Sequence, residues 1–189
     1  MGASADITQP MEPAPAAAVL FPGLYEAELP YVLRSLRRLG VPAADAEDLT
    51  HEVFVVAFQS LDQIDASRPL RPWLFGIALK LAANFRRKAQ RSREVGDEAL
   101  EAPDDRADPE GAAAARQDRE LVLRALGDVE LDRRAVFVMY ELNGHSMADI
   151  AEALGIPVNT AYSRLRLARA EFAESVRRLR PPELPGGVA

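Results

Sequence analysis

Apolar residues recur at steps of three and four along most of the chain, which is the spacing of amphipathic helices. The first such run extends from Leu24 to Leu39 and is followed by Gly40 and Pro42, which end helices. Comparable runs predict a second helix at about 43–59, a third that begins near Pro72, and further helices at about 112–126 and 132–142. The expected core row of the third helix is Leu74, Ile77, Leu81 and Phe85. We therefore expect an all-α fold.

Three segments lack this periodicity. Residues 1–23 are rich in Ala and Pro, which predicts a disordered N-terminal tail, and residues 181–189 are expected to form a C-terminal tail. Residues 94–116 are rich in acids and contain Pro103 and Pro109, which predicts a flexible acidic linker. The pattern thus divides the chain into two small helical domains, 24–93 and 117–180, and the linker permits compact or extended placement of them.

The C-terminal part carries a helix-turn-helix pattern. Ser146 and Asp149 fit a capping arrangement ahead of a short helix. Gly155 can adopt the positive φ of a tight turn, and Pro157 can begin a longer helix. The expected core side of that helix is Ala161, Leu165, Ala168 and Phe172. The second helix of such a motif lies in the DNA major groove, although a three-helix bundle with a glycine turn would produce the same pattern.

Composition excludes several classes of protein. The 189 residues include no cysteine, which removes disulfide frameworks, thiolate zinc sites and thiol catalysis. No apolar run approaches the roughly 18 residues of a membrane span. The first basic residue is Arg34, so the N-terminus does not have the pattern of a secretory signal. We therefore expect a cytoplasmic protein.

Charge is segregated along the chain, although the net charge is −6. Residues 66–93 contain eight basic residues and no acid, residues 94–120 contain ten acids and three arginines, and residues 159–180 contain six arginines and two glutamates. Two basic blocks around an acidic one are typical of a protein that binds a polyanion such as nucleic acid. Solvated helix faces are the alternative explanation.

Both basic blocks place directional hydrogen-bonding groups on a helix face. Steps of four, three and four put one set on the same side of the third helix: Lys80, Asn84, Arg87 and Arg91. The exposed positions of the last helix carry amides, hydroxyls and guanidiniums, which match base edges and phosphates. These positions are Asn159, Thr160, Tyr162, Ser163, Arg164, Arg166 and Arg169.

Three segments in this order and spacing resemble the extracytoplasmic-function group of sigma-70-type RNA polymerase sigma factors. They are DAEDLTHEVF at 45–54, RPWLFGIA at 71–78 and DIAEALGIP at 149–157, the last running into Ser163-Arg164-Leu165 and Ala168-Arg169. The resemblance extends over nearly all of 24–179. It implies a sigma-2 helical bundle at 24–93 and a sigma-4 helix-turn-helix domain at 117–180. It also implies a non-enzymatic initiation factor that directs core polymerase to promoters and helps to open them.

The resemblance implies a role for each basic or acidic face. In this family the second helix of sigma-2 binds the clamp helices of the polymerase beta-prime subunit. That places Asp45, Glu47, Asp48, Leu49, Glu52 and Val53 at or near the polymerase. There is an alternative explanation for each of these residues. The acids could simply stabilise the helix dipole, and Leu49 and Val53 could simply belong to the core.

The family resemblance also implies two DNA-binding sites. The loop 61–69 and the third helix would capture and read the minus-ten element, through Arg68, Arg71, Lys80, Asn84, Arg87, Lys88 and Arg91, while Trp73 is expected to anchor the core. The last helix would read the minus-35 element, with Tyr162, Ser163 and Arg166 toward the groove and Arg164 and Arg169 on phosphates. Asn159, Tyr162 and Leu167 depart from the residues usual in the family. The promoter sequence that this chain recognises therefore cannot be inferred from those of its relatives.

The implied partners are core RNA polymerase, through its beta-prime clamp helices and beta flap, promoter DNA and an anti-sigma factor. No cofactor, metal or small-molecule substrate is expected. One alternative is a free-standing helix-turn-helix regulator, but this would not require the polar stripe and the acidic helix of the first domain. Another is a metal-dependent or hydrolytic enzyme that uses Asp48, His51, Glu52 and His145. The chain has no paired-histidine motif, Gly-rich phosphate loop or nucleophile elbow to support it.

Overall fold

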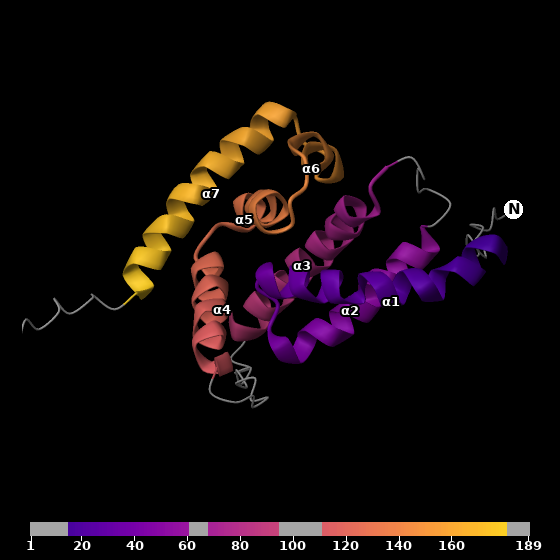
Figure 1. The fold of residues 1–189 in the computed structure, drawn as a ribbon, viewed down its shortest axis with the longest axis horizontal. Coiled ribbons are helices and arrows are strands. Elements are labelled where there is room, and N and C mark those ends of the chain that lie inside the picture. Colours follow the sequence, from indigo (N-terminus) through magenta and orange to yellow (C-terminus); the bar gives the residue numbers. More distant parts are fainter. Residues whose placement is uncertain (1–14, 61–67, 95–110, 181–189) are drawn as a thin grey trace, which may run out of the picture.

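The chain is described from a computed structural model that covers residues 15–60, 68–94 and 111–180. Throughout this part every regular element is a helix, which confirms the predicted all-α fold. The helices form two groups, one from each half of the chain, and the groups lie against each other (Figure 1).

The N-terminal group contains α1 (Pro15–Arg38), α2 (Ala43–Gln59) and α3 (Leu70–Glu94), and each helix packs against the other two. Its centre is apolar, and the side chains buried there include Val32, Leu36, Val53, Phe54, Leu74 and Phe75. Burying one such side chain stabilises the fold by about 1.5–3 kcal/mol. Trp73 is half-buried and packs against this core.

Helix α1 begins earlier than the sequence pattern predicts. The expected tail extends to Gly23, whereas α1 begins at Pro15, so the prediction is wrong for residues 15–23. Phe21 anchors this part of the helix to α2, because its ring meets Phe58 edge-on with 4.9 Å between ring centroids. Pro22 and Pro30 lie inside the helix. Pro22 conceals the helical start from pattern analysis, since proline normally breaks helices.

The C-terminal group contains α4 (Gly111–Gly127), α5 (Leu131–Phe137), the π-helical segment η2 (Val138–Leu142), α6 (Met147–Ala153) and α7 (Val158–Leu179). Helix α7 packs against α4, α5 and α6. The predicted core row of α7 is correct: Ala161, Leu165 and Ala168 are buried and Phe172 is half-buried. This row holds the C-terminal group together.

Two boundaries in this half differ from the prediction. Helix α4 begins at Gly111, which agrees with the helix expected at about 112–126, so the linker bound of 94–116 extended too far into this helix. Residues 95–110 lie outside the described residues. The expected single helix at 132–142 is α5 followed directly by η2. Apolar spacing does not distinguish a π-helical turn from an α-helical one.

Helices α6 and α7 form the predicted helix-turn-helix. Ser146 caps α6, because its hydroxyl oxygen accepts from the Asp149 backbone N–H at 3.1 Å and donates to the Asp149 carboxylate at 2.6 Å. Gly155 has a φ of +63°, as the sequence predicts, and a side chain at this position would be strained. Pro157 is the N-cap of α7.

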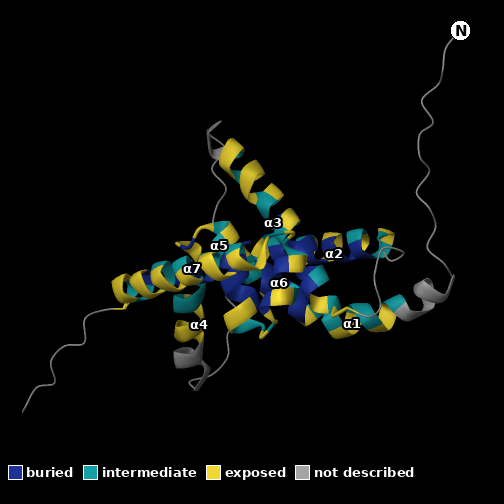
Figure 2. Cartoon of the chain, turned by 90° about the horizontal axis from the view of Figure 1, so that it is seen from above, coloured by how far each residue is buried: buried dark blue, intermediate teal, exposed yellow. Residues whose placement is uncertain are grey.

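The two groups share a continuous apolar core. Leu39 and Val41 after α1 belong to the same buried cluster as Leu126 of α4 and Val129, which follows α4. Helix α3 also contacts α6, where a side chain at Gly76 would place its Cβ only 3.0 Å from the Ala153 carbonyl oxygen. Figure 2 shows the buried residues gathered where α6 lies against the N-terminal helices.

A buried guanidinium joins the two groups. Arg134 of α5 is 1% exposed and donates to the Leu39 carbonyl at 2.9 Å and to the Gly127 and Val129 carbonyls at 2.7 Å. Burial lowers the pKa of Arg134 to about 10, so it remains charged at neutral pH. Gly40, with a φ of +93°, leaves room for it, because a Cβ there would lie 2.5 Å from Arg134 Nη1.

A polar cluster crosses the same interface. The Tyr31 hydroxyl lies 2.9 Å from His145 Nε2 and accepts from Asn143 Nδ2 at 3.3 Å, while Arg38 donates to Asn143 Oδ1 at 2.6 Å. Burial raises the pKa of Tyr31 to about 12 and lowers the pKa of His145. At neutral pH the phenol and the imidazole are therefore both uncharged, and one hydrogen bond joins them.

Candidate nucleic-acid and partner interfaces

The polar stripe predicted on α3 lies on the surface. Its members Lys80, Asn84, Arg87 and Arg91 are all exposed, as is the neighbouring Lys88. Figure 2 shows the C-terminal end of α3 extending away from the packed helices. Arg87 donates to Asn84 Oδ1, which leaves the Asn84 amide nitrogen as a donor for an external acceptor. The α3 stripe thus combines three cations with one directional donor.

Arg68 and Arg71 do not join the α3 stripe. Arg68 forms an ion pair with Glu152 of α6, across the interface between the two groups. Arg71 donates to Glu28 of α1 at 2.8 Å and lies over the Tyr31 ring, 5.2 Å from its centroid. The hydrogen bond to Glu28 raises the pKa of Arg71. Residues 61–67 of the predicted base-capturing loop lie outside the described residues.

The acidic face of α2 is open to solvent. Glu47, Asp48 and Glu52 are exposed, and Asp45 and Leu49 are half-buried. Val53 has no exposed surface, so in this conformation it stabilises α2 from the core side and is not available to a partner.

Val55, which is 55% exposed, is the apolar side chain that α2 presents to solvent. The apolar rows expected to face the core are Leu49, Val53 and Val56, and next to them Phe54 and Phe58. Val55 lies in neither row, which is the signal that it is exposed, and sequence analysis did not single it out.

On α7 the structure separates the predicted residues into two sets. Asn159, Tyr162, Ser163 and Arg166 are exposed, and within the described part of the chain Arg166 has no ion pair. Thr160 is half-buried. Arg164 pairs with Asp132 at 2.8 Å, and Arg169 pairs with Glu141 at 2.5 Å. The first set is immediately available to a ligand, whereas the two arginines must exchange partners.

Val158 is an α7 residue that sequence analysis missed. It is the first residue of the helix and is 43% exposed, whereas an apolar residue at a helix start is usually assumed to pack inward. Its spacing could have revealed its exposure. Val158 lies one turn before Tyr162 and is not part of the predicted core row of Ala161, Leu165, Ala168 and Phe172.

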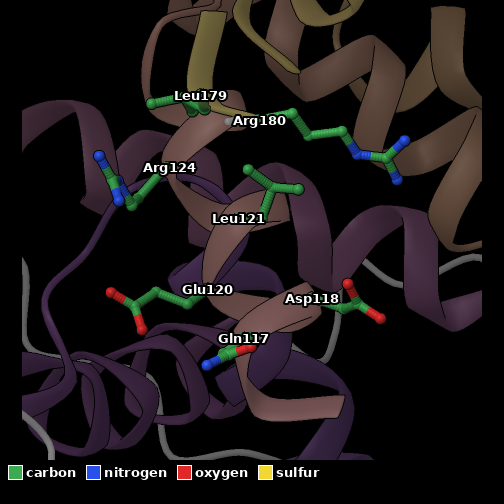
Figure 3. A pocket seen from close by; sticks show the side chains of 7 residues that line it. All are labelled: Gln117, Asp118, Glu120, Leu121, Arg124, Leu179 and Arg180. Carbon is green, nitrogen blue, oxygen red and sulfur yellow. The ribbon is translucent and has the colours of Figure 1, made fainter. Parts of the chain in front are cut away.

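A shallow pocket lies between α4 and the end of α7 (Figure 3). Its lining residues are Gln117, Asp118, Glu120, Leu121, Arg124, Leu179 and Arg180. Figure 3 shows its charged side chains pointing away from one another, with Leu121 and Leu179 between them. Ligand sites need polar groups that converge, so this pocket has no catalytic or metal-binding arrangement.

The alternative metal site is not assembled. His51 Nδ1 lies 3.0 Å from the Tyr25 hydroxyl, and His145 is engaged with Tyr31, so the two histidines belong to different clusters. Across residues 21–60, 68–92 and 116–180, no three acidic or histidine side chains come together as ligands for one ion. None of the helices in the described residues is both long and apolar enough to span a membrane.

Two family models match the chain in order. Residues 24–92 match Sigma-70 region 2, and residues 119–172 match Sigma-70, region 4. The chain is 35% identical over 156 residues to the ECF RNA polymerase sigma factor SigL of Mycobacterium tuberculosis, covering 82% of this chain and 88% of the relative. It is 32% identical over 148 residues to the RNA polymerase sigma factor CnrH of Cupriavidus metallidurans, covering 74% of this chain and 78% of the relative.

Solved structures show the same fold. CnrH in complex with the cytosolic domain of CnrY matches with a TM-score of 0.65 and 26% identity, over 87% of this chain and 94% of that one. The sigma factor RpoE in complex with the anti-sigma factor NepR from Bartonella quintana matches with a TM-score of 0.66 and 24% identity, over 85% and 98%. Both matches extend over the two helical groups.

Proposed function

The chain belongs to the extracytoplasmic-function group of the sigma-70 family of RNA polymerase sigma factors, and from this premise we propose how its surfaces divide the work of starting transcription. It is a transcription initiation factor, which joins core RNA polymerase and directs it to promoters with minus-35 and minus-ten elements. The single observation that supports this assignment of roles is that α3 and α7, in separate helical groups, each have an exposed polar surface.

The acidic face of α2 is our proposed polymerase-binding surface. Asp48 and Glu52 would meet basic residues of the beta-prime clamp helices, and Val55 would form the apolar centre of the contact. Asp45, Glu47 and Leu49 border this surface, and Val53 supports it from inside the bundle. Sigma-4 would contact the beta flap of the same polymerase.

The α3 stripe is our proposed minus-ten surface. Extruding a base from the duplex costs a few kcal/mol, which a protein without ATP recovers through phosphate contacts and a shaped pocket. Lys80, Arg87 and Arg91 would follow the backbone of the unpaired strand, and Asn84 would donate to a base. Lys88 would add a further phosphate contact.

Arg68 and Arg71 can join the minus-ten surface by exchanging partners. Both arginine side chains are more than half exposed in their pairs with Glu152 and Glu28, whereas Glu28 itself is only 15% exposed. A pair exposed on both sides, such as Arg68–Glu152, is worth only about 0–1 kcal/mol. Phosphate groups would therefore compete successfully for these arginines once the N-terminal and C-terminal groups move apart.

Helix α7 is our proposed minus-35 surface. Asn159, Tyr162, Ser163 and Arg166 would face the bases of the major groove, with Thr160 at the edge of the contact. Arg164 and Arg169 would leave Asp132 and Glu141 for phosphates, and these pairs are partly exposed, with Arg164 28% and Glu141 32% exposed.

Catalysis belongs to the polymerase in this proposal, and the chain contributes no enzymatic step. Because its partners are core polymerase and promoter DNA, we place its activity in the cytoplasm. The solved structure of CnrH is a complex with the cytosolic domain of CnrY, and that of RpoE is a complex with an anti-sigma factor. An inhibitor of the same class is therefore our proposed regulator of this chain.

The test adds the full chain to core polymerase with fragmented genomic DNA of its host and sequences the transcripts. We expect a discrete set of start sites preceded by two shared elements. Co-purification with core polymerase at low salt is the accompanying measurement. A chain that binds promoter DNA alone and does not co-purify with polymerase would be a free-standing regulator, and the proposal would be wrong.

A further inference from the structure

Two exposed apolar side chains lie next to each other at the start of α7. Among the described residues, the large hydrophobic side chains that remain exposed are Val55, Tyr140, Val158 and Tyr162. Val158 is 43% exposed and Tyr162 is 56% exposed. They are four positions apart, so their side chains are neighbours on successive turns of the helix. We call this pair the Val158–Tyr162 patch.

Packing within the chain does not explain the patch. The buried row of α7 runs through Ala161, Leu165 and Ala168, and the patch lies beside that row. Within the described part of the chain, Tyr162 takes part in no hydrogen bond and no ring contact. Adjacent apolar groups left in water are typical of a surface that a partner covers.

The position of the patch indicates which partner covers it. Helix α7 begins at Val158, directly after the turn formed by Gly155 and Pro157. In a helix-turn-helix the N-terminal residues of the second helix meet base edges in the major groove. The apolar group that B-DNA presents there is the C5-methyl group of thymine.

Charge around the patch favours DNA over an apolar protein surface. Arg166 lies one turn beyond Tyr162, is exposed and has no ion pair within the described part of the chain. Arg164 and Arg169 on the same helix pair with Asp132 and Glu141, and they add two further cations when phosphates replace these carboxylates. A partner that fits both features carries dense negative charge and small apolar groups, and duplex DNA containing thymine has both.

We propose that Val158 and Tyr162 are specificity-determining residues that recognise thymine C5-methyl groups in the minus-35 element. This inference rests on the proposed function of α7 as the helix that reads this element. The Tyr162 ring lies against a methyl group while its hydroxyl stays in water or reaches a phosphate. Arg166, farther along α7, is placed to contact guanine.

The helix geometry limits where the thymines lie. Four residues of α-helix rise by about 6 Å, and base pairs are stacked at about 3.4 Å along the duplex. The two side chains therefore contact methyl groups no more than about two base steps apart. The thymines can lie on either strand, because both strands expose their methyl groups in the major groove.

The test uses the holoenzyme and a promoter taken from the transcript sequencing described above. Each thymine of the minus-35 element is replaced in turn by deoxyuridine, which removes only the C5-methyl group. Loss of one buried methyl group predicts binding weaker by about three- to fivefold at one or two neighbouring positions. Deoxyuridine at thymines between the two promoter elements should leave binding unchanged.

Protein variants test whether the Val158–Tyr162 patch causes the weaker binding to deoxyuridine. Val158→Ala should weaken binding to the thymine promoter and abolish the difference between thymine and deoxyuridine at one position, and Tyr162→Ala should do so at the other. Glu174→Ala, an exposed change in the C-terminal half of α7, is the control that keeps the full difference. Circular dichroism verifies that each variant remains helical.

Three results would overturn the proposal. One is a minus-35 element that lacks thymine or is insensitive to deoxyuridine at every position. Another is a Val158→Ala holoenzyme whose promoter binding is weakened by deoxyuridine as much as that of the unmodified holoenzyme. The third is unchanged promoter binding by both variants, which would assign the patch to a protein partner. Because the holoenzyme still selects promoters in each of these results, they are distinguishable from failure of the proposed function, in which no holoenzyme forms.

Discussion

Arg134 is a buried cation whose partners are backbone carbonyls rather than a carboxylate. Its three acceptors are the carbonyls of Leu39, which follows α1, of Gly127, the last residue of α4, and of Val129, which follows α4. Carbonyls at helix C-termini are unpaired within the helix and carry partial negative charge. One guanidinium therefore satisfies two helix ends from different groups, which offsets the cost of removing its charge from water.

Replacing this guanidinium should destabilise the whole molecule. Arg134→Met keeps the apolar stem but leaves buried carbonyls without donors, and we expect the free energy of unfolding to fall by about 3 kcal/mol. Urea denaturation followed by circular dichroism measures the change. Arg177→Met, at an exposed arginine paired with Glu174, is the matched control and should change stability by less than about 1 kcal/mol. A loss below about 1 kcal/mol for Arg134→Met would show that water replaces the guanidinium.

His145 should make the packing between the two groups depend on pH. It faces Tyr31 from α1, Arg71 from α3, which opposes its protonation, and Asp149 from α6, which favours it. Burial lowers its pKa, so the unfolded chain binds the proton more readily than the folded chain. The free energy of unfolding therefore decreases as pH falls below about 6.5, the pKa of an unperturbed histidine, and the His145 contribution is constant above that value.

Thermal unfolding between pH 5 and pH 8 tests this dependence. His145→Gln keeps a hydrogen-bond acceptor for Tyr31 but cannot be protonated, so its stability should fall less steeply than that of the unmodified chain below pH 6.5. Carboxylates such as Asp128, whose pKa is lowered by its hydrogen bond with Ser175, titrate in both proteins and cancel in the comparison. Identical slopes would remove His145 as the responsible group.

At the scale of helices, elements with regular periodicity and clear ends were predictable. The second expected helix, 43–59, has the same limits as α2, because Pro42 precedes it and its apolar rows are regular. The turn at Gly155 was predictable because few residues other than glycine adopt a positive φ. The four members of the α3 stripe are exposed as expected, because polar residues at steps of three and four stay on one face.

Features that depend on distant contacts were not predictable. The helical start of α1 depends on the packing of Phe21 against Phe58, which lies in another helix. The partner of Arg68 is Glu152, in the other half of the chain. The residues next to Arg68 in the sequence show that it is charged but not which carboxylate it pairs with. Val53 belongs to a face with both acidic and core neighbours, and only the packed bundle shows that it is buried.

The α3 stripe should act in promoter opening and not in polymerase binding. Arg87→Glu with Arg91→Glu reverses two exposed charges, and we expect heparin-resistant open complexes to decrease at least tenfold while co-purification with core polymerase is retained. The physical reason is repulsion between the new carboxylates and the phosphates of the unpaired strand. Arg177→Glu is the control, because it reverses one exposed charge at the far end of α7. Open complexes at the unmodified level in the double variant would exclude the stripe from this role.

At the scale of the whole molecule, the two groups form one body even though the proposed DNA-binding surfaces lie on different helices. The net charge of −6 is the sum over acidic and basic blocks, so it does not describe the charge of either surface. Packing between α3 and α6 holds Arg68 in its ion pair with Glu152. Binding two separated promoter elements therefore competes with the contacts that hold the groups together.

Gly76 provides a way to separate the groups without altering a charge. A Cβ at this position would lie 3.0 Å from the Ala153 carbonyl oxygen, so Gly76→Leu leaves no room for α6 against α3. We expect the distance between these helices to increase while each helical group remains folded. Since the chain has no cysteine, Gln90→Cys and Ala148→Cys allow specific fluorescent labelling of α3 and α6 for energy-transfer measurements.

Energy transfer should be lower in labelled Gly76→Leu than in the otherwise unmodified labelled chain, with circular dichroism unchanged. Gly127→Ala is the control, because its Cβ would meet no atom within 4 Å, and it should keep the original transfer efficiency. If transfer in Gly76→Leu equals that of the control, the contact between α3 and α6 does not hold the groups together. In that case the closed arrangement would depend on the shared apolar core, on Arg134, and on the polar cluster of Tyr31, Arg38, Asn143 and His145.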